Sequence, residues 1–168
     1  MKIMIFLTVA MLCCFTTSFG QQNFNWDKWE NYIGNWIGEG SGIPGKGGGT
    51  FSFTLDLDKN VLIRKSHSGY PLPDGKVQTH DDLMVIYLDI NLNPSKAIYF
   101  DNEGHTINYQ ISYVDKTIIL TSEKVPNSPV SRLVYSMLDN ETCNTRFEIS
   151  QDGEQFTPYI QGNSKRIK

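Results

Sequence analysis

Cysteine is nearly absent from this sequence. It has three cysteines in 168 residues, and Cys13 and Cys14 both fall within the first twenty. Only Cys143 lies farther along, so removal of residues 1–20 would exclude an internal disulfide. The domain must then be held together by a hydrophobic core. Residues 21–168 are long enough to form one as a single domain.

Long apolar runs are missing after the first twenty residues. The one such run, Ile3 to Phe15, follows the basic Lys2 and precedes Ser18-Phe19-Gly20, whose small residues suit a cleavage site. The run is too short to span a bilayer. We therefore interpret residues 1–20 as a signal peptide. We expect an exported protein, periplasmic or extracellular, with no transmembrane segment in its mature chain.

A surplus of basic residues is also lacking. The chain has 15 Lys and Arg against 18 Asp and Glu, a formal net charge of −3, and loss of the signal peptide would remove Lys2. Domains that bind nucleic acid usually carry a basic patch, so the composition argues against a nucleic-acid partner. Nothing in the sequence indicates a particular oligomeric state.

Alternation of apolar and polar residues dominates the chain after residue 48. Between Phe51 and Leu57, and again between Ile107 and Tyr113, every second residue is apolar, as in a half-buried strand. Helical spacing occurs once, between Trp26 and Ile33, and predicts a short N-terminal helix that ends at Gly34. The period of two predicts ten strands, near 35–40, 49–58, 60–68, 82–90, 95–101, 105–114, 117–122, 131–139, 142–150 and 156–167.

Ten consecutive strands without a long helix exclude a parallel sheet, because parallel strands need long crossover connections. A meander that closes on itself removes exposed sheet edges. Short turns near 58–60, 91–94, 115–116 and 139–141 alternate with long connections at 40–49, 69–81 and 123–130. We therefore predict an all-β fold, an antiparallel up-and-down barrel of about ten strands. One end is tightly turned, and the other is a loop-rich mouth where sites usually lie.

Several stretches are similar to known barrel families. Gly34-Asn35-Trp36, after the short helix, resembles the Gly-x-Trp signature of the calycins, which include lipocalins and fatty-acid-binding proteins. The run 34–42 resembles the start of nitrobindin-type ten-stranded barrels. The stretches 80–87 and 97–105 resemble an uncharacterised group of bacterial exported proteins.

This resemblance implies a structural role for Trp36, which would close the barrel floor beneath an arginine of the last strand. Arg166 is the arginine available there, so we expect a cation–π contact worth about 0.5–2 kcal/mol. Nitrobindin-type barrels hold haem through a histidine near the C-terminus. Since this chain has no histidine after His105, no cofactor is predicted.

The strand after Asn60 places a cation inside the barrel wall in either of two registers. A two-residue turn would point Arg64 inward, and a three-residue turn would point Lys65 inward. An unpaired charge there would be costly, so it needs a carboxylate. That carboxylate could belong to a ligand, or to the protein, for instance Glu39.

Polar groups cluster in two connections at the predicted mouth. His80, Asp81 and Asp82 end one connection, while Asp101, Asn102, Glu103 and His105 form another at the same end of the barrel. If they converge, three roles are open: a general base at an enzyme site formed by His80, Asp81 and His105, a metal site, or recognition of a ligand's polar end. Because the spacing matches no fixed metal motif, no metal ligand is assigned.

The function favoured by the sequence is binding of a small hydrophobic molecule, with or without a carboxylate, in the barrel cavity. Arg64 or Lys65, together with Glu103, would meet the polar end. The predicted aromatic walls are Phe53, Tyr109, Tyr113 and Tyr135. A ten-stranded barrel has room for such a ligand. The alternatives are a hydrolase or isomerase at the mouth and, less favoured, a haem or metal carrier.

Overall fold

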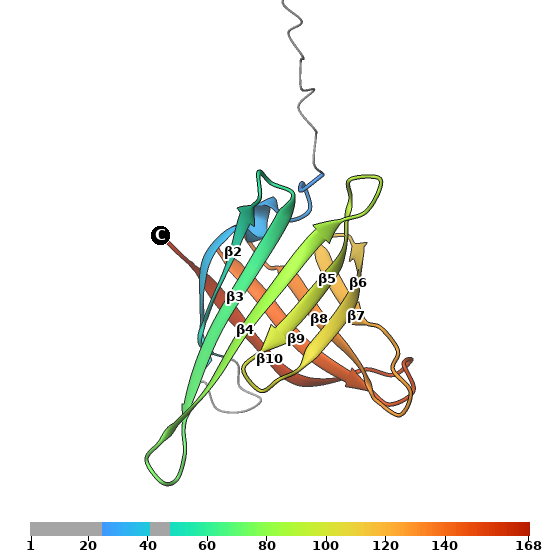
Figure 1. The fold of residues 1–168 in the computed structure, drawn as a ribbon. Helices are drawn as coiled ribbons and strands as arrows, with labels where there is room; N and C mark the ends of the chain where they lie inside the picture. The colour runs from blue at the N-terminus through green and yellow to red at the C-terminus, as the bar shows by residue number, and fades with distance from the viewer. Residues whose placement is uncertain (1–24, 41–47) are drawn as a thin grey trace, which may run out of the picture.

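The computed structural model describes residues 25–40 and 48–168 (Figure 1). The predicted signal peptide, residues 1–20, and residues 41–47 of the first long connection lie outside the described residues. Within the part described, no helix is both long and apolar enough to cross a membrane.

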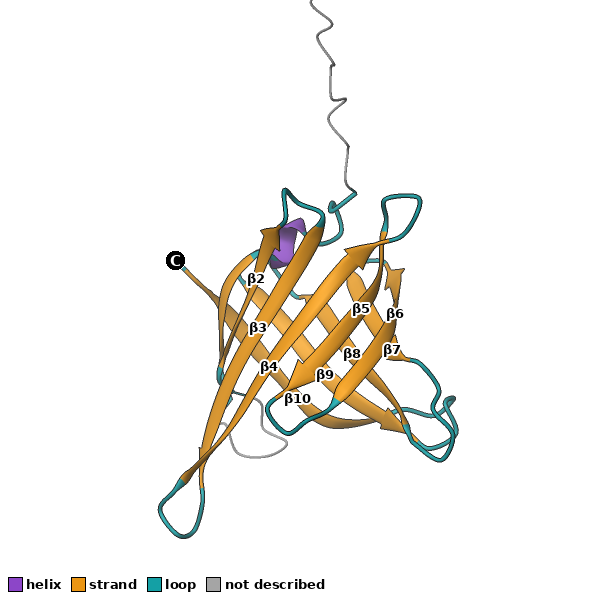
Figure 2. Ribbon diagram, in the orientation of Figure 1, coloured by secondary structure: helices purple, strands orange, loops and turns teal. Residues whose placement is uncertain are grey.

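Ten antiparallel strands follow one 3-10 turn, η1 (Glu30–Tyr32). Each strand pairs with its neighbours in sequence, and the first pairs with the last, so the barrel is closed (Figure 2). The predicted all-β barrel is confirmed, and it is consistent with a calycin-like fold. The strands are β1 (Gly34–Gly38), β2 (Thr50–Asp56), β3 (Val61–Pro71), β4 (Val77–Leu88), β5 (Pro94–Asp101), β6 (Thr106–Val114), β7 (Thr117–Ser122), β8 (Val130–Met137), β9 (Thr142–Ser150) and β10 (Thr157–Ile167).

The connection predicted at 69–81 is wrong. Residues there continue β3 and β4 as a paired hairpin as far as Pro71 and Val77, which projects beyond the other strands in Figure 1. Beyond Pro71, the Leu72 N–H still donates to the Lys76 carbonyl at 2.7 Å. The remaining turn closes at Gly75, whose φ of +82° lies in the left-handed region that glycine adopts without strain.

The turn between β2 and β3 settles which cation faces inward. Asp56 pairs with Val61 and Leu55 with Leu62, so the loop has four residues instead of the two or three considered from the sequence. Because two and four have the same parity, Arg64 points into the barrel and Lys65 points out. The register that placed Lys65 inside is therefore wrong.

The N-terminal segment closes the tightly turned end of the barrel. Trp26 Nε1 donates to the Lys59 carbonyl at 2.8 Å, and the Tyr32 hydroxyl donates to the Lys116 carbonyl at 3.0 Å. Between them, Trp29 is fully buried. Trp26 and Tyr32 thus each combine apolar burial with a hydrogen bond to a turn, which fixes the segment across the barrel end.

The Arg166–Trp36 contact expected from the family resemblance is present. The guanidinium carbon of Arg166 lies 4.4 Å from the Trp36 ring centroid, and its two Nη atoms donate at 2.7 Å to the carbonyls of Ile33 and Asn31. A Cβ at Gly34, where φ is +125°, would lie 3.0 Å from Arg166 Nη1. The glycine before Asn35 therefore leaves room for the arginine that covers Trp36.

Aromatic rings fill the half of the barrel next to this closed end. Phe53 lies 5.4 Å from Trp29 and 5.4 Å from Tyr135, measured between ring centroids, and Tyr32 lies 6.1 Å from Tyr135. Phe51 continues the cluster toward the barrel centre, 6.4 Å from Tyr135. Such tilted and edge-on pairs each add about 0.5–1.5 kcal/mol beyond area burial, so this half is a packed core.

Candidate functional site

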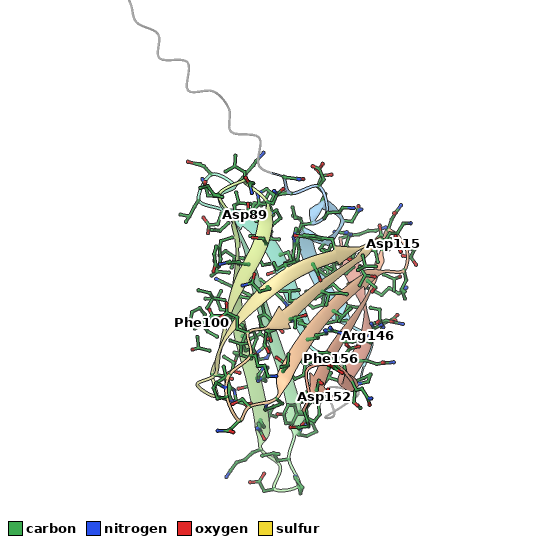
Figure 3. The ribbon with its side chains drawn as sticks, turned by 90° about the vertical axis from the view of Figure 1, so that its right-hand side faces the viewer. Asp89, Phe100, Asp115, Arg146, Asp152 and Phe156 are labelled. Atoms are coloured by element: carbon green, nitrogen blue, oxygen red, sulfur yellow. The ribbon has the colours of Figure 1, made fainter. Side chains whose placement is uncertain are left out.

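The polar groups of the interior lie toward the other end of the barrel, the mouth. Along β4 the inward residues are Ile86, Met84, Asp82 and His80, so the inner face changes from apolar to polar as the strand nears the mouth. In Figure 3, Asp89 and Asp115 lie at the closed end and Asp152 at the mouth. The candidate site is therefore built on strands that the closed half holds rigid.

Arg64 and Asp82 form a buried ion pair in the middle of the barrel wall. Their side chains are 8% and 6% exposed, and Nη1 of Arg64 donates to Oδ1 of Asp82. Burial lowers the pKa of Arg64, but Tyr135 and the Asp82 carboxylate outweigh it and raise that pKa above its usual value. The carboxylate that Arg64 requires thus comes from the protein, and it is Asp82, not Glu39.

Two buried polar atoms, one in this pair and one near it, have no hydrogen-bond partner among the described residues. They are Nε of Arg64 and the hydroxyl of Tyr135. Burial raises the pKa of Tyr135 above its usual value, so the hydroxyl stays protonated and can donate. Each unsatisfied buried group costs about 1–3 kcal/mol, which makes this pair of donors the clearest anomaly of the interior.

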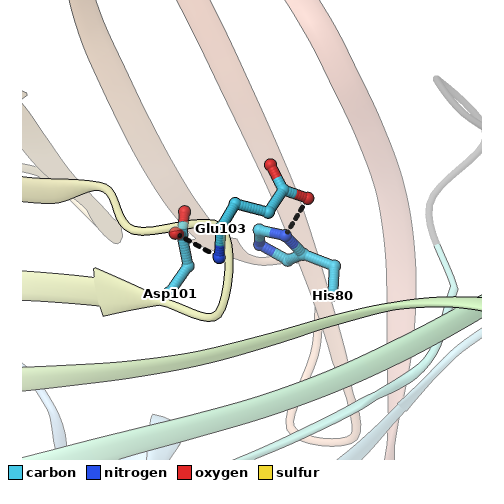
Figure 4. A group of neighbouring side chains, drawn as sticks. All are labelled: His80, Asp101 and Glu103. Carbon is cyan, nitrogen blue, oxygen red and sulfur yellow. Dashed lines mark hydrogen bonds and ion pairs between the residues drawn. The ribbon is translucent and has the colours of Figure 1, made fainter.

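His80 lies above this pair, with both ring nitrogens in contact. Nδ1 is 3.2 Å from Glu103 Oε1 (Figure 4). Nε2 is 3.0 Å from the Tyr99 hydroxyl and 3.8 Å from Asp82 Oδ2. Burial and then the charges of Asp82 and Asp101 raise the pKa of Tyr99 above its usual value. A neutral Tyr99 therefore connects His80 with Asp101, to which its hydroxyl donates at 3.3 Å.

Asp101 organises the turn between β5 and β6. Its Oδ1 accepts the backbone N–H groups of Glu103 and His105 at 3.0 and 2.9 Å, and its Oδ2 lies 2.8 Å from His105 Nδ1. Burial opposes ionisation of Asp101, but the His105 and Glu103 donors lower its pKa below its usual range. The turn is tied to β4 because Asn102 N–H donates to the Asp81 carbonyl at 3.0 Å.

The histidines of the mouth converge, but Asp81 does not join them. His80 and His105 contact opposite oxygens of Glu103, at 3.2 and 4.0 Å. Asp81 faces outward, where its Oδ1 lies 2.6 Å from Nδ1 of His67. The predicted grouping of His80, Asp81 and His105 is therefore wrong, since alternation along β4 points Asp81 away from its two neighbours.

His80, Asp101 and Glu103 are the described residues that could hold a metal ion. One ligand atom of each lies within 4.8 Å of the others. Their ligand atoms already have partners, because His80 Nδ1 contacts Glu103 Oε1 and the Asp101 oxygens accept from backbone N–H groups, Tyr99 and His105. The cluster can also relay a proton, because an imidazole oriented by a carboxylate can act as a general base.

The predicted aromatic walls divide between the two halves of the barrel. Phe53 belongs to the packed core, and Tyr113 lies at the closed end, where its hydroxyl accepts from Trp29 Nε1 at 2.9 Å and donates to the Pro94 carbonyl. The prediction that these two line a ligand site is corrected, because the N-terminal segment fills that half. The Tyr135 ring packs in the same core, against Phe53, while the buried Tyr109 has its hydroxyl 3.5 Å from Ser131 Oγ.

Lys65 lines a hollow on the outside of the barrel. This open groove of about 750 Å³ crosses β1 to β5 and the end of β10, and residues such as Ser52, Leu83 and Phe100 line it beside Lys65. None of its lining residues comes from β6–β9, on the opposite wall. The groove therefore belongs to the outer surface of the wall and not to the barrel centre.

Sequence reasoning placed Asp82 among the polar groups of the mouth but missed its inward direction and its ion pair with Arg64, and it missed Tyr99 as part of the site. The signal for Asp82 was present, since His80, Asp82, Met84 and Ile86 continue the period of two that marks β4. Starting the strand at residue 82 left His80 and Asp81 in a loop and hid the alternation. Met84 pairs with Arg64 on one side and with Tyr99 on the other, so the three residues form one row across the sheet. Only the pairing register reveals this row.

Comparisons with known proteins give no indication of the function of this chain. No family model matches the chain, and no curated protein shows significant sequence similarity to it.

Proposed function

We propose that this protein is an exported binding protein that holds a small, largely apolar molecule in the mouth half of its barrel. The observation that carries this proposal is incomplete burial of apolar side chains that face inward. Ile107, Ile111 and Phe147 pack against the core yet remain only partly buried. Apolar side chains that point into the barrel without being fully covered by their neighbours offer apolar surface to a ligand.

The surroundings of these side chains suit a molecule with one polar end. Partly buried apolar side chains of β6 and β9 point into the same barrel interior as the buried Arg64–Asp82 pair and the Tyr135 hydroxyl. Small-molecule sites usually combine mostly apolar walls with a few fixed polar groups. Export is supported by the signal-like residues 1–20, and mass measurement of the secreted chain should give an N-terminus at Gln21.

The uncharged fluorescent probe N-phenyl-1-naphthylamine tests the binding site. We expect saturable binding to the wild type, and native mass spectrometry of protein purified without denaturation should detect a retained molecule. Ile107→Trp fills the interior and should weaken probe binding at least about tenfold, a change equivalent to 1.4 kcal/mol. Gln110→Trp adds the same ring to the outward face of β6 and should leave binding unchanged.

The proposal is wrong if the probe does not bind in a saturable manner. It is equally wrong if Ile107→Trp and Gln110→Trp bind the probe alike, since binding would then occur on the outer surface. Circular dichroism of each variant should first show the β-barrel spectrum of the wild type.

A further inference from the structure

The unsatisfied donors at the barrel centre indicate what kind of polar group the bound molecule carries. Nε of Arg64 and the Tyr135 hydroxyl are both buried without a partner. Both side chains lie against the Phe51 ring: the Arg64 guanidinium carbon is 5.3 Å from its centroid, and the Tyr135 ring centroid is 6.4 Å away. Arg64 and Tyr135 also influence each other's pKa through their charges, so the two side chains lie near each other, yet Arg64 Nε and the Tyr135 hydroxyl do not form a hydrogen bond.

A group that satisfies both donors must be an acceptor. The Arg64 Nε can only donate, and the protonated Tyr135 hydroxyl can donate its hydrogen to the same atom. A carbonyl oxygen has two lone pairs and accepts two hydrogen bonds, whereas the N–H of a ligand amine would leave Arg64 Nε unpaired. The donor pair therefore selects an oxygen acceptor.

Charge decides between an uncharged carbonyl and a carboxylate. Arg64 is the only buried lysine or arginine of the described chain, and Asp82 already neutralises it. A ligand carboxylate would bring a second negative charge next to Asp82 with no further buried cation to balance it. An unbalanced buried charge costs several kcal/mol, so the neutral acceptor is favoured.

We propose that the interior site recognises an uncharged carbonyl, as in a ketone, ester or amide, through Arg64 Nε and the Tyr135 hydroxyl. This inference rests on the proposed function, because it names the polar end of the molecule held in the barrel. Asp82 acts as a positioning residue: it fixes the guanidinium and sets the charge of the site without contacting the ligand. A fatty acid is accordingly a poor ligand, although a bare arginine would favour one.

Octanamide and octanoate provide a matched test, because they share a seven-carbon chain and differ in the charge of the head group. Each is titrated against protein loaded with N-phenyl-1-naphthylamine at pH 7. We expect octanamide to displace the probe at a concentration at least about tenfold below that of octanoate. Tyr135→Phe should raise the dissociation constant of octanamide, calculated with the probe affinity measured for the same variant, about fivefold to tenfold and change that of octanoate less.

Two variants serve as controls for this test. Tyr159→Phe removes the hydroxyl of an exposed tyrosine and should leave both titrations unchanged. Asp82→Asn removes the charge that neutralises Arg64 and should shift the preference toward octanoate. Thermal unfolding monitors whether each variant is folded at the assay temperature, and Tyr135→Phe carries the test alone if Asp82→Asn is not.

The outcomes separate the two proposals. Saturable probe binding without displacement by octanamide, or with octanoate at least as effective, overturns the carbonyl assignment but not the binding function. An unchanged octanamide titration in Tyr135→Phe also overturns it. Absence of saturable probe binding overturns the binding function itself.

Discussion

The Arg64–Asp82 ion pair should dominate the effect of charge removal on stability. Asp82→Asn keeps the shape of the side chain but leaves the Arg64 charge buried without a counter-charge, in a place where the two side chains are only 8% and 6% exposed. Breaking a buried pair in this way costs about 3–5 kcal/mol. Because the asparagine oxygen can still accept from Arg64 Nη1, we expect the lower part of that range, about 3 kcal/mol.

Asp81→Asn is the matched control, one residue away on the same strand. Asp81 faces outward, is 50% exposed and pairs with His67, which is 59% exposed. Exposed pairs contribute less than about 1 kcal/mol, so this variant should unfold almost as the wild type does. Adding Arg64→Met to Asp82→Asn removes the remaining buried charge and should restore most of the lost stability.

Urea unfolding at pH 7, followed by tryptophan fluorescence, measures these differences. Trp26, Trp29 and Trp36 are all buried, so their emission reports the closed half of the barrel directly. The dependence of the unfolding free energy on urea should be the same for every variant, as a comparison of midpoints requires. Equal losses of unfolding free energy in Asp81→Asn and Asp82→Asn would contradict this prediction, because burial of the ion pair would then have no part in the effect.

Three further predictions concern other parts of the barrel. Arg166→Met removes the cation at 4.4 Å from the Trp36 ring and two donors at 2.7 Å from backbone carbonyls; the unfolding free energy should fall by about 2–4 kcal/mol, and a loss below about 1 kcal/mol would contradict the contact. Backbone N–H donors of the next turn, and then the Ser150 hydroxyl, lower the pKa of Asp152 to about 2. The stabilisation is therefore fully present above the unfolded value of about 3.9 and is lost as the pH falls toward 2; carboxyl NMR titration should show this midpoint, and Ser150→Ala should raise it. Burial raises the pKa of Cys143 to about 11, so a thiol reagent should not label folded protein but should label it in urea, and rapid native labelling would show that the thiol is accessible.

Strand positions were predictable because burial of one sheet face imposes a period of two. The alternation from Phe51 to Leu57 gave β2, and the one from Ile107 to Tyr113 gave β6, each within two residues of its bounds. The length of the turn between β2 and β3 was harder to predict from the sequence. Loop length alone decides whether Arg64 or Lys65 faces inward, and Asp58-Lys59-Asn60 suits loops of several lengths.

The site itself depends on pairing between strands far apart in sequence. Asp82 reaches Arg64, 18 residues away, because β3 and β4 pair with Ser66 opposite Asp82. Proximity of His80 to Glu103 was expected from the shared barrel end, since alternate connections of a meander lie together. The unsatisfied Tyr135 hydroxyl left no trace in the sequence, because a tyrosine at that position of β8 fits a packed core equally well.

A crystal structure of the protein with octanamide tests the central claim most directly. We expect the octanamide oxygen inside the barrel within about 3 Å of both Arg64 Nε and the Tyr135 hydroxyl, with the alkyl chain against Ile107, Ile111 and Phe147. An interior filled by rearranged side chains, or octanamide bound only on the outer wall, would contradict it.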